Sequence, residues 1–374
     1  MRMKKIMILA VTAFALAACA KTYEVKESTP PPIGFGAWTE TLTKARTQGE
    51  STWTDGDKFT VYGYKTNGAG TEVTVFNGVE VTCDDASATP SVWSYTDTRF
   101  WDKNFANYYF YGISKDASDA ITYATAWNAQ AGTCVSNNVT FTGKNYDILV
   151  AKEKNVASAS YGSPVEMDFT HIASMFDVKF RKAHALANAE VKITAITLSG
   201  IKTTGAFSVT GYASTIPSVT WTANSPATVA DGVTAYTAGV TDCSAGFNTD
   251  IADWGAVEAP SAAGTPLVGH YIAMPQGLGD GDSDPRITFT YTIKVGDETT
   301  TYTDNVINFS KFDKHDSNAD GGDNTTNGSP DSFITSWEQG KHYTYYVTIG
   351  ANAIQFTASI TPWTTVNGYN YLIN

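Results

Sequence analysis

Short runs of alternating apolar and polar residues recur along most of the chain, and they constrain its fold more than any other feature. Glu190–Leu198, Ile287–Val295 and Tyr343–Ile349 are examples, and Gly, Pro or Asn residues separate such runs. A period of two places successive side chains on opposite faces of a β-strand. Many short strands between turn residues favour a sandwich over a βαβ fold. We therefore expect an all-β protein.

The other strand-like runs follow the same pattern. They are Ile33–Thr41, Lys58–Lys65, Tyr108–Ile113, Tyr146–Lys152, Val165–Phe180, His270–Met274 and Ile354–Ile360. The clearest local pattern is Glu72–Cys83, where valines alternate on both sides of Asn77-Gly78. Because Asn-Gly readily supplies two residues with positive φ, this stretch predicts a hairpin with a type I′ turn.

Composition and charge exclude two classes of protein. Aromatic residues make up 13 % of the chain and charged residues 17 %, against the ~25 % charged that is usual. Apolar residues reach 42 %, enough to build a core, so the chain is not a disordered one. The net charge of −12 would repel nucleic-acid phosphates, which argues against a nucleic-acid-binding protein.

The first residues have the layout of an export signal. Basic residues precede the apolar run Ile6–Leu16, which is too short to span a bilayer as a helix. The run ends in Leu16-Ala17-Ala18-Cys19, which resembles a bacterial lipobox. We expect residues 1–18 to be a lipoprotein signal peptide and Cys19 to carry lipid. An ordinary signal peptide cut near this position is the alternative.

Composition also suggests where the chain divides. Residues 20–32 are polar and end in three prolines, as an extended tether would. Leu42–Gly49 has the composition of an exposed, cleavable connection. At Ala183–Ala189 the residues become small and polar. A boundary there predicts one β-sandwich over residues 47–186 and a second over residues 187–374.

Patterns of catalytic residues are missing from the sequence. The five histidines show no H-E-x-x-H spacing, and there is neither a G-x-S-x-G nor a phosphate-binding loop motif. We therefore expect no enzyme and no cofactor.

The cysteines leave two possibilities open. Cys83 and Cys134 could form a disulfide, and small buried thiols are the alternative. No C-x-x-C motif suggests a redox or zinc site.

Acidic residues form the strongest site-like pattern. The spacing Asp316-x-Asn318-x-Asp320-Gly321 matches the first six positions of a calcium-binding loop. The twelfth position is Asn327, where such a loop has a bidentate glutamate. Asp280-x-Asp282-x-Asp284 is a weaker second instance. Calcium binding is one hypothesis for these loops, and a solvated turn is the alternative.

Five segments, taken in order, resemble motifs of the fimbrillin family of Bacteroidetes, the type V pilins and their Mfa-like relatives. They are the lipobox at Cys19, Thr43–Tyr64, Phe169–Phe176, Ala273–Gln276, and Trp337–Tyr345 with Ile360–Trp363. Together they span nearly the whole chain. The resemblance implies two tandem transthyretin-like β-sandwich domains after a lipoprotein signal peptide. It also implies a structural subunit of a surface pilus rather than an enzyme.

The resemblance further implies a route of assembly. A lipidated precursor reaches the outer membrane through the lipoprotein-processing machinery, and an Arg- or Lys-specific protease cuts before the first domain. In this chain Arg46 is the expected cut site, and residues 19–46 are the lipidated tether and removable N-terminal strand. A surface or pilus-tip lipoprotein that acts as an adhesin or binds glycans is the alternative function.

In this scheme the departing strand leaves a groove, which a strand from another pilus subunit fills. The expected donor is residues 364–374. Its alternation places Tyr369, Tyr371 and Ile373 on one face and Val366 and Leu372 on the other. The alternatives are that Arg46 is an ordinary surface arginine and that the last residues are an edge strand of their own domain.

Overall fold

The computed structural model describes residues 30–36, 53–67, 72–88, 91–115, 125–128, 133–140, 148–182, 186, 188–210, 218–223, 229–230, 233–234, 268–314, 333–350 and 354–362. Strands and short 3₁₀ turns, η2 (Ser158–Ser160) and η5 (Phe309–Lys311), make up the regular structure in these ranges. The expected all-β fold is confirmed. A search of the same residues finds no helix that could cross a membrane.

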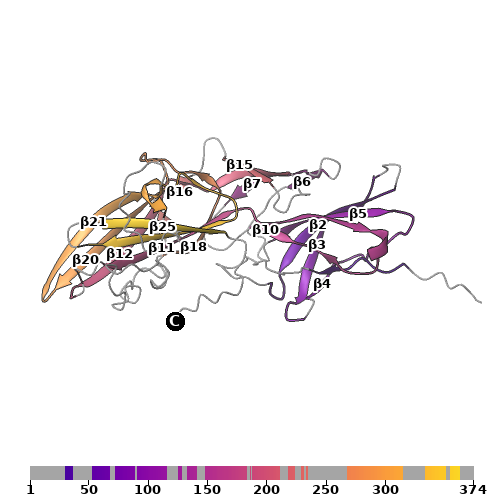
Figure 1. The fold of residues 1–374 in the computed structure, drawn as a ribbon, viewed down its shortest axis with the longest axis horizontal. Helices are drawn as coiled ribbons and strands as arrows, with labels where there is room; N and C mark the ends of the chain where they lie inside the picture. Colours follow the sequence, from indigo (N-terminus) through magenta and orange to yellow (C-terminus); the bar gives the residue numbers. More distant parts are fainter. Residues whose placement is uncertain are drawn as a thin grey trace, which may run out of the picture.

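One end of the elongated molecule is built on a six-stranded sheet, called here the first sheet (Figure 1). Its order is β10 (Phe169–His171), β8 (Leu149–Ala157), β5 (Asn107–Lys115), β2 (Lys58–Thr66), β3 (Glu72–Asp85) and β4 (Val92–Ser94). All neighbouring strands in it are antiparallel. Beside it, β1 (Phe35–Gly36) pairs in parallel with β9 (Val165–Glu166).

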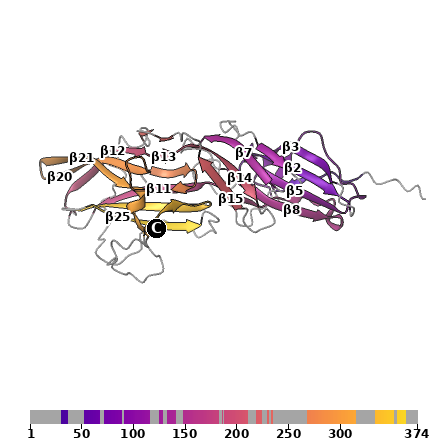
Figure 2. The same ribbon diagram turned by 90° about the horizontal axis from the view of Figure 1, so that it is seen from above.

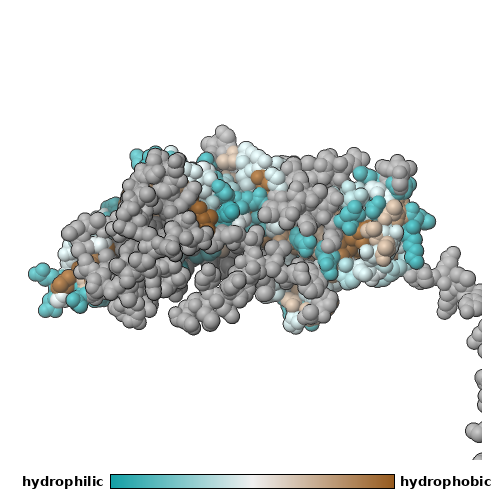
Figure 3. Space-filling model, in the orientation of Figure 1, coloured by the Kyte–Doolittle hydropathy of each residue, from teal (hydrophilic) through white to brown (hydrophobic). Residues whose placement is uncertain are grey.

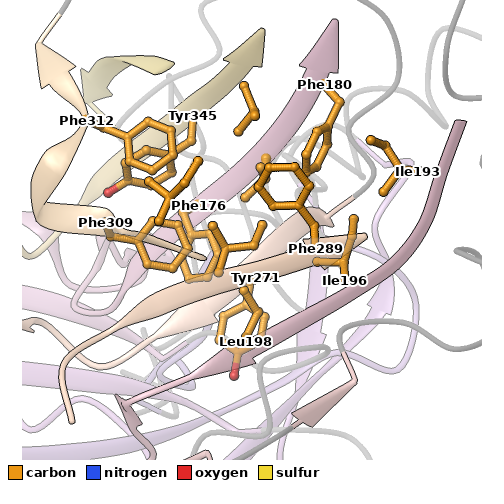
Figure 4. Close-up of a cluster of buried hydrophobic side chains, with 14 of the residues drawn as sticks. Phe176, Phe180, Ile193, Ile196, Leu198, Tyr271, Phe289, Phe309, Phe312 and Tyr345 are labelled. Atoms are coloured by element: carbon orange, nitrogen blue, oxygen red, sulfur yellow. The ribbon is translucent and has the colours of Figure 1, made fainter. Parts of the chain in front are cut away.

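The other end contains two sheets packed face to face (Figure 2). One has the order β18 (Val268–Ala273), β11 (Ser174–Lys182), β24 (Lys341–Ile349), β25 (Ile354–Pro362) and β22 (Asp313–Lys314). The facing sheet has the order β17 (Val233–Thr234), β12 (Glu190–Ser199), β20 (Arg286–Val295) and β21 (Glu298–Asn308). Figure 4 shows the aromatic and aliphatic side chains that fill the space between them, such as Phe176, Phe289 and Tyr345.

A further four-stranded sheet, called here the shared sheet, is shared by the two ends of the molecule. Its order is β15 (Ser218–Ala223), β14 (Thr204–Thr210), β7 (Thr133–Thr140) and β6 (Thr125–Asn128). Strands β6 and β7 lie between β5 and β8 in the chain, whereas β14 and β15 follow β12. Two short pairs complete the described strands: β13 (Ile201–Lys202) with β16 (Val229–Ala230), and β19 (Gln276–Gly277) with β23 (Ser336–Trp337).

A separate hydrophobic cluster lies between the first sheet and the shared sheet. Tyr111 and Val150 from the first sheet meet Phe207 and Met175 in this cluster, and all are buried. The indole Nε1 of Trp221 donates a hydrogen bond of 2.8 Å to the carbonyl oxygen of Ile172. Backbone pairing and buried apolar surface therefore both join the two ends.

We expect the substitution Phe207→Ala to lower the free energy of unfolding by about 3–5 kcal/mol, since it opens a cavity in this joining cluster. Phe207 is 1 % exposed. Chemical denaturation should show a single transition at lower denaturant. The control is Tyr302→Ala, because Tyr302 is 39 % exposed and its removal costs less. Two separate transitions, only one of them shifted, would contradict a joint unit.

The predicted hairpin at Asn77-Gly78 is wrong. Strand β3 continues through these residues and pairs with β2 along its length. Val61 pairs with Val79 and Tyr62 with Asn77, so the register shifts there and Gly78 is the extra residue. Gly78 has a φ of 72°. Its positive φ therefore serves a bulge within a long strand instead of a turn.

The sheets change earlier in the chain than the predicted boundary at residue 186. Strand β11 precedes that boundary, yet it pairs with β18 and β24 of the second end. The change falls between His171, in the first sheet, and Ser174. The run Val165–Phe180, taken from sequence as one stretch, contains β9, β10 and most of β11. The division into two tandem domains remains a prediction.

Cys83 is a buried free thiol, which settles one of the alternatives left open by the sequence. Burial, assisted by the nearby carboxylate of Asp57, raises the pKa of Cys83 to about 11. The thiol is therefore protonated at neutral pH and packs as a small apolar side chain. The side chain of Cys134 lies outside the part of the chain that the structure describes.

Candidate functional site

Residues 31–36, called here the docked segment, lie against the core of the first end as an inserted strand. On one side the segment meets residues 99–101 in an antiparallel bridge. The amide of Ile33 donates to the carbonyl oxygen of Arg99 at 2.8 Å, and the amide of Trp101 donates to that of Pro31 at 3.0 Å. The three prolines before Ile33 favour this extended backbone.

The other side of the docked segment pairs with β9. The amide of Val165 donates to the carbonyl oxygen of Gly34 at 2.8 Å, and the amide of Met167 donates to that of Gly36 at 3.0 Å. The two strands run parallel here. The docked segment therefore fills a groove between residues 99–101 and residues 165–167, held by backbone hydrogen bonds on both sides.

Two side chains of the docked segment point into the core. Ile33 is 1 % exposed and Phe35 is 4 % exposed. Four rings surround Phe35 in edge-on contacts, with centroid distances of 6.0 Å to Phe59, 5.3 Å to Phe76, 5.7 Å to Tyr95 and 5.8 Å to Phe110. Burial of one such side chain contributes about 1.5–3 kcal/mol, so these two supply most of the apolar stabilisation of the segment.

A tyrosine hydroxyl connects the docked segment to the wall of the groove. The hydroxyl of Tyr95 donates to the carbonyl oxygen of Ile33 at 2.6 Å and accepts from the amide of Arg99 at 3.1 Å. Burial raises the pKa of Tyr95, so the hydroxyl keeps its proton at neutral pH. Since the bond is to a main-chain carbonyl, it does not depend on which side chain the strand carries.

The glycines of the docked segment face away from this core. A Cβ atom added at Gly34 would meet no atom within 4 Å, and one added at Gly36 would lie 3.8 Å from the Cβ of Pro164. The groove therefore has room for strands that carry side chains at both positions. Glycine in a strand costs roughly 0.5–1 kcal/mol relative to alanine, so the segment binds more weakly than its shape would allow.

We expect Tyr95→Phe to speed hydrogen exchange at the amides of Val165 and Met167 about 5- to 10-fold. Their acceptors are carbonyl groups of the docked segment, and a lost hydrogen bond of about 1–1.5 kcal/mol raises the open population by that factor. Exchange followed by mass spectrometry or NMR measures the effect.

The matched control is Tyr161→Phe. The hydroxyl of Tyr161 donates to the carbonyl oxygen of Phe105 at 2.7 Å in the same end of the molecule, and no hydrogen bond links it to the docked segment. Equal exchange in both variants would show that Tyr95 supports only the fold and does not hold the segment.

Most of the site residues expected from the sequence lie outside the described residues. These are Cys19, Arg46, Val366, Tyr369, Tyr371, Leu372, Ile373 and the acidic loop with Asp316, Asn318 and Asp320. The expected N-terminal strand Ile33–Thr41 is described only to residue 36, and its buried apolar side chains, Ile33 and Phe35, are on the face that the alternation predicted.

The second acidic pattern falls within the described residues, and two of its three carboxylates, Asp280 and Asp284, have protein partners. Asp280 forms an ion pair with Lys311 at 2.7 Å. A carboxylate oxygen of Asp284 accepts from the amide of Gly281 at 2.9 Å. Among the described residues, no group of three or more His, Cys, Asp or Glu side chains is arranged to hold a metal ion.

The walls of the groove could not be found by sequence reasoning. Tyr95 lies in the connection between β4 and β5, and β9 is a two-residue strand. Neither carries a motif, because both bind the docked segment through the backbone or through a single hydroxyl. The only signal in the sequence is the aromatic content of β2, β3 and β5, whose rings form the cage around Phe35.

Comparison with known proteins identifies relatives over most of the chain. A model of the fimbrillin-like family matches residues 43–363. A fimbrial protein from Bacteroides vulgatus is 16 % identical, with 89 % of this chain and 99 % of that chain covered and a TM-score of 0.56. An identity this low shows a shared fold alone. A comparison with curated proteins finds no match.

Two further structures are less similar. A candidate cell adhesion protein from Bacteroides uniformis is 14 % identical, with 90 % of this chain and 99 % of that chain covered and a TM-score of 0.47. The tip fimbrial protein Mfa3 from Porphyromonas gingivalis, truncated at its C terminus, is 9 % identical, with 89 % and 100 % coverage and a TM-score of 0.39. Neither score is high enough to carry an argument.

Proposed function

Because the chain belongs to the fimbrillin-like family, we propose that it is a structural subunit of a cell-surface pilus that polymerises by strand exchange. It is exported as a lipoprotein, with Cys19 lipidated at the outer membrane. A protease then cuts after Arg46, residues 31–36 leave the groove, and residues 364–374 of another subunit replace them. The protein acts by assembly, with other pilus subunits as its partners, and not by catalysis.

The observation that supports this proposal is the docked segment. It is bound on both sides by backbone hydrogen bonds, as an added strand would be. It precedes the basic stretch with Arg46 in the sequence, so one cut separates it from the remainder of the chain. Its own contribution to the core is limited to Ile33 and Phe35.

Loss of the segment creates the driving force for assembly. An empty groove exposes the rings around the Phe35 position and leaves the amides of Trp101, Val165 and Met167 without the acceptors they have now. An incoming strand restores both kinds of contact. A donor without glycine at the two outward positions gains strand propensity as well, and the space beside Gly34 admits its side chains.

Cleavage by an arginine-specific protease tests the proposal. The recombinant chain from Ala20 is treated, and mass spectrometry and size analysis follow the products. We expect one early cut after Arg46 and then a ladder of oligomers. The matched control is Arg46→Lys, which keeps the positive charge and resists this protease, and it should stay monomeric.

A chain that resists cleavage at Arg46, or that is cut there and stays monomeric, contradicts a polymerising subunit. Either result would favour the alternative of a surface or tip lipoprotein, and glycan binding by the monomer would then be the next property to measure. Oligomers of the uncut Arg46→Lys chain would show that cleavage does not control assembly.

A further inference from the structure

The docked segment matches the groove incompletely at Trp101. The amide of Trp101 donates to the carbonyl oxygen of Pro31 at 3.0 Å, and the next residue of the segment, Pro32, is bridged to Phe100. This antiparallel register places Pro31 directly opposite Trp101. In such a hydrogen-bonded pair each residue normally donates its amide to the other. Because proline has no N–H group, the docked segment makes only one of these two bonds.

The side chain of Trp101 is matched incompletely as well. It is 0 % exposed, and its ring stacks on that of Tyr161 with a centroid distance of 4.6 Å. Among the residues that the structure describes, none accepts a hydrogen bond from the indole Nε1 of Trp101. A buried N–H group without an acceptor destabilises the state that buries it. The groove therefore contains a donor that the docked segment does not use.

The indole of Trp101 lies on the same face of the pair as the ring of Pro31. Residues directly opposite each other in an antiparallel pair have Cβ atoms about 4.5–5.5 Å apart on one face. A Cβ atom added at Gly162 would lie 3.5 Å from the Cγ of Pro31, and the preceding residue, Tyr161, stacks on the indole. A short polar side chain in place of Pro31 is therefore close enough to bond the indole.

The opposite face of the docked segment is exposed to solvent. Pro32 is exposed, and the side chain of Phe100 beside it is 49 % exposed. Figure 3 shows hydrophilic and hydrophobic residues interspersed on the visible surface of this first end, at the right of the view. The outward positions place few demands on a strand in the groove. Selection therefore falls on the inward positions, which are 31, 33 and 35.

We propose that Trp101 determines which strand the groove prefers, by favouring a residue with an amide N–H and a side-chain oxygen at the position of Pro31. The amide of such a residue, for example threonine, donates to the carbonyl oxygen of Trp101, and its side-chain oxygen accepts from the indole Nε1. The partner is an extended strand of another pilus subunit. The docked segment lacks both groups, so it is the weaker ligand. This inference rests on the proposed strand exchange.

Two substitutions in the docked segment isolate the bond to the indole. Pro31→Thr and Pro31→Val both restore an amide N–H and both remove the proline constraint on the released chain. The two side chains have the same shape, and a hydroxyl replaces one methyl group. The amides of Val165 and Met167 donate to the docked segment. We expect them to exchange at least about 5-fold more slowly in Pro31→Thr than in Pro31→Val, because the added bond lowers the open population.

The indole proton gives a direct measurement. In ¹H–¹⁵N NMR spectra the Nε1 resonance of Trp101, assigned by its loss in Trp101→Phe, should lie further downfield in Pro31→Thr than in Pro31→Val. A role of Trp101 in packing alone would not move this resonance. When each Pro31 variant is combined with Trp101→Phe, the two chains should exchange at equal rates. Equal resonance positions in Pro31→Thr and Pro31→Val would overturn the proposal.

Failure of this inference and failure of the proposed function give different results. After cleavage at Arg46, the Pro31→Thr chain should form oligomers more slowly than the Pro31→Val chain, because its segment leaves the groove less readily. A downfield resonance with equal rates of oligomer formation would support the role of Trp101 and contradict release of the segment as the step that controls assembly. Equal resonance positions would overturn the role of Trp101 and leave the proposed strand exchange intact.

Discussion

Replacement of Phe35 by alanine should release residues 31–36 from the groove without any proteolytic cut. Phe35 is the largest buried side chain of the segment and contacts four rings of the core. Loss of a buried phenylalanine costs about 3–5 kcal/mol. Every 1.4 kcal/mol is a factor of ten in an equilibrium constant. The open population of the segment should therefore rise at least about 100-fold.

Hydrogen exchange at the amides of Val165 and Met167 measures this effect, since both donate to the docked segment. The amides of β12 and β20, which pair in the other end of the molecule, report whether the whole chain has been destabilised. The control is Phe100→Ala. Phe100 is bridged to Pro32 of the same segment, but its side chain is 49 % exposed.

Fast exchange confined to Val165 and Met167 would show that the segment opens as a separate unit. Faster exchange in β12 and β20 to the same extent would show that Phe35 supports the whole fold. Unchanged exchange would mean that backbone pairing alone holds the segment, and the apolar groove would then matter little for assembly.

Strands with one buried face were predictable from the sequence. In β12 and β20, Val191, Ile193, Ile287 and Phe289 face the core and polar residues alternate with them. A face that is buried selects apolar residues at every second position, so the period of two is visible. The same reason explains the correct expectation for β2, in which Phe59 and Val61 are buried and alternate with less buried residues.

Strand β21 was missed for the opposite reason. Its first seven residues are exposed, and it contains a run of threonines without alternation. Threonine favours strands, but an edge strand exposed on both faces has no apolar period.

The wrongly predicted hairpin at Asn77-Gly78 has another cause. A positive φ at Gly78 suits either a turn or a bulge, and only the pairing with β2 decides between them.

The candidate site was also predictable only in part from the sequence. The alternation of Ile33 and Phe35 was visible, because the segment supplies its own side chains to the core. The groove that receives the segment was not visible, because Tyr95 and β9 lie 62 and 130 residues further along the chain than their partners in the segment. A groove that recognises backbone groups leaves no side-chain pattern, so local sequence could not reveal it.

The largest effect on assembly is expected for chains that have either an open groove or a donor strand, but not both. A chain without residues 364–374, cut after Arg46, has a groove but no donor. A chain with Arg46→Lys keeps residues 31–36 in the groove and still carries a donor. Each alone should stay monomeric. Mixed together they should form a 1:1 complex and nothing larger, because the complex has neither a free groove nor a free donor.

Size-exclusion chromatography with light scattering measures the outcome. The uncut chain that lacks residues 364–374 is the control, and its mixture with the Arg46→Lys chain should contain monomers only. Oligomers beyond the 1:1 complex would reveal a second contact able to propagate the fibre, such as the exposed hairpin of β20 and β21. No complex at all would mean that the groove filled by residues 31–36 is not an acceptor for residues 364–374, and the docked segment would then be a permanent part of the core.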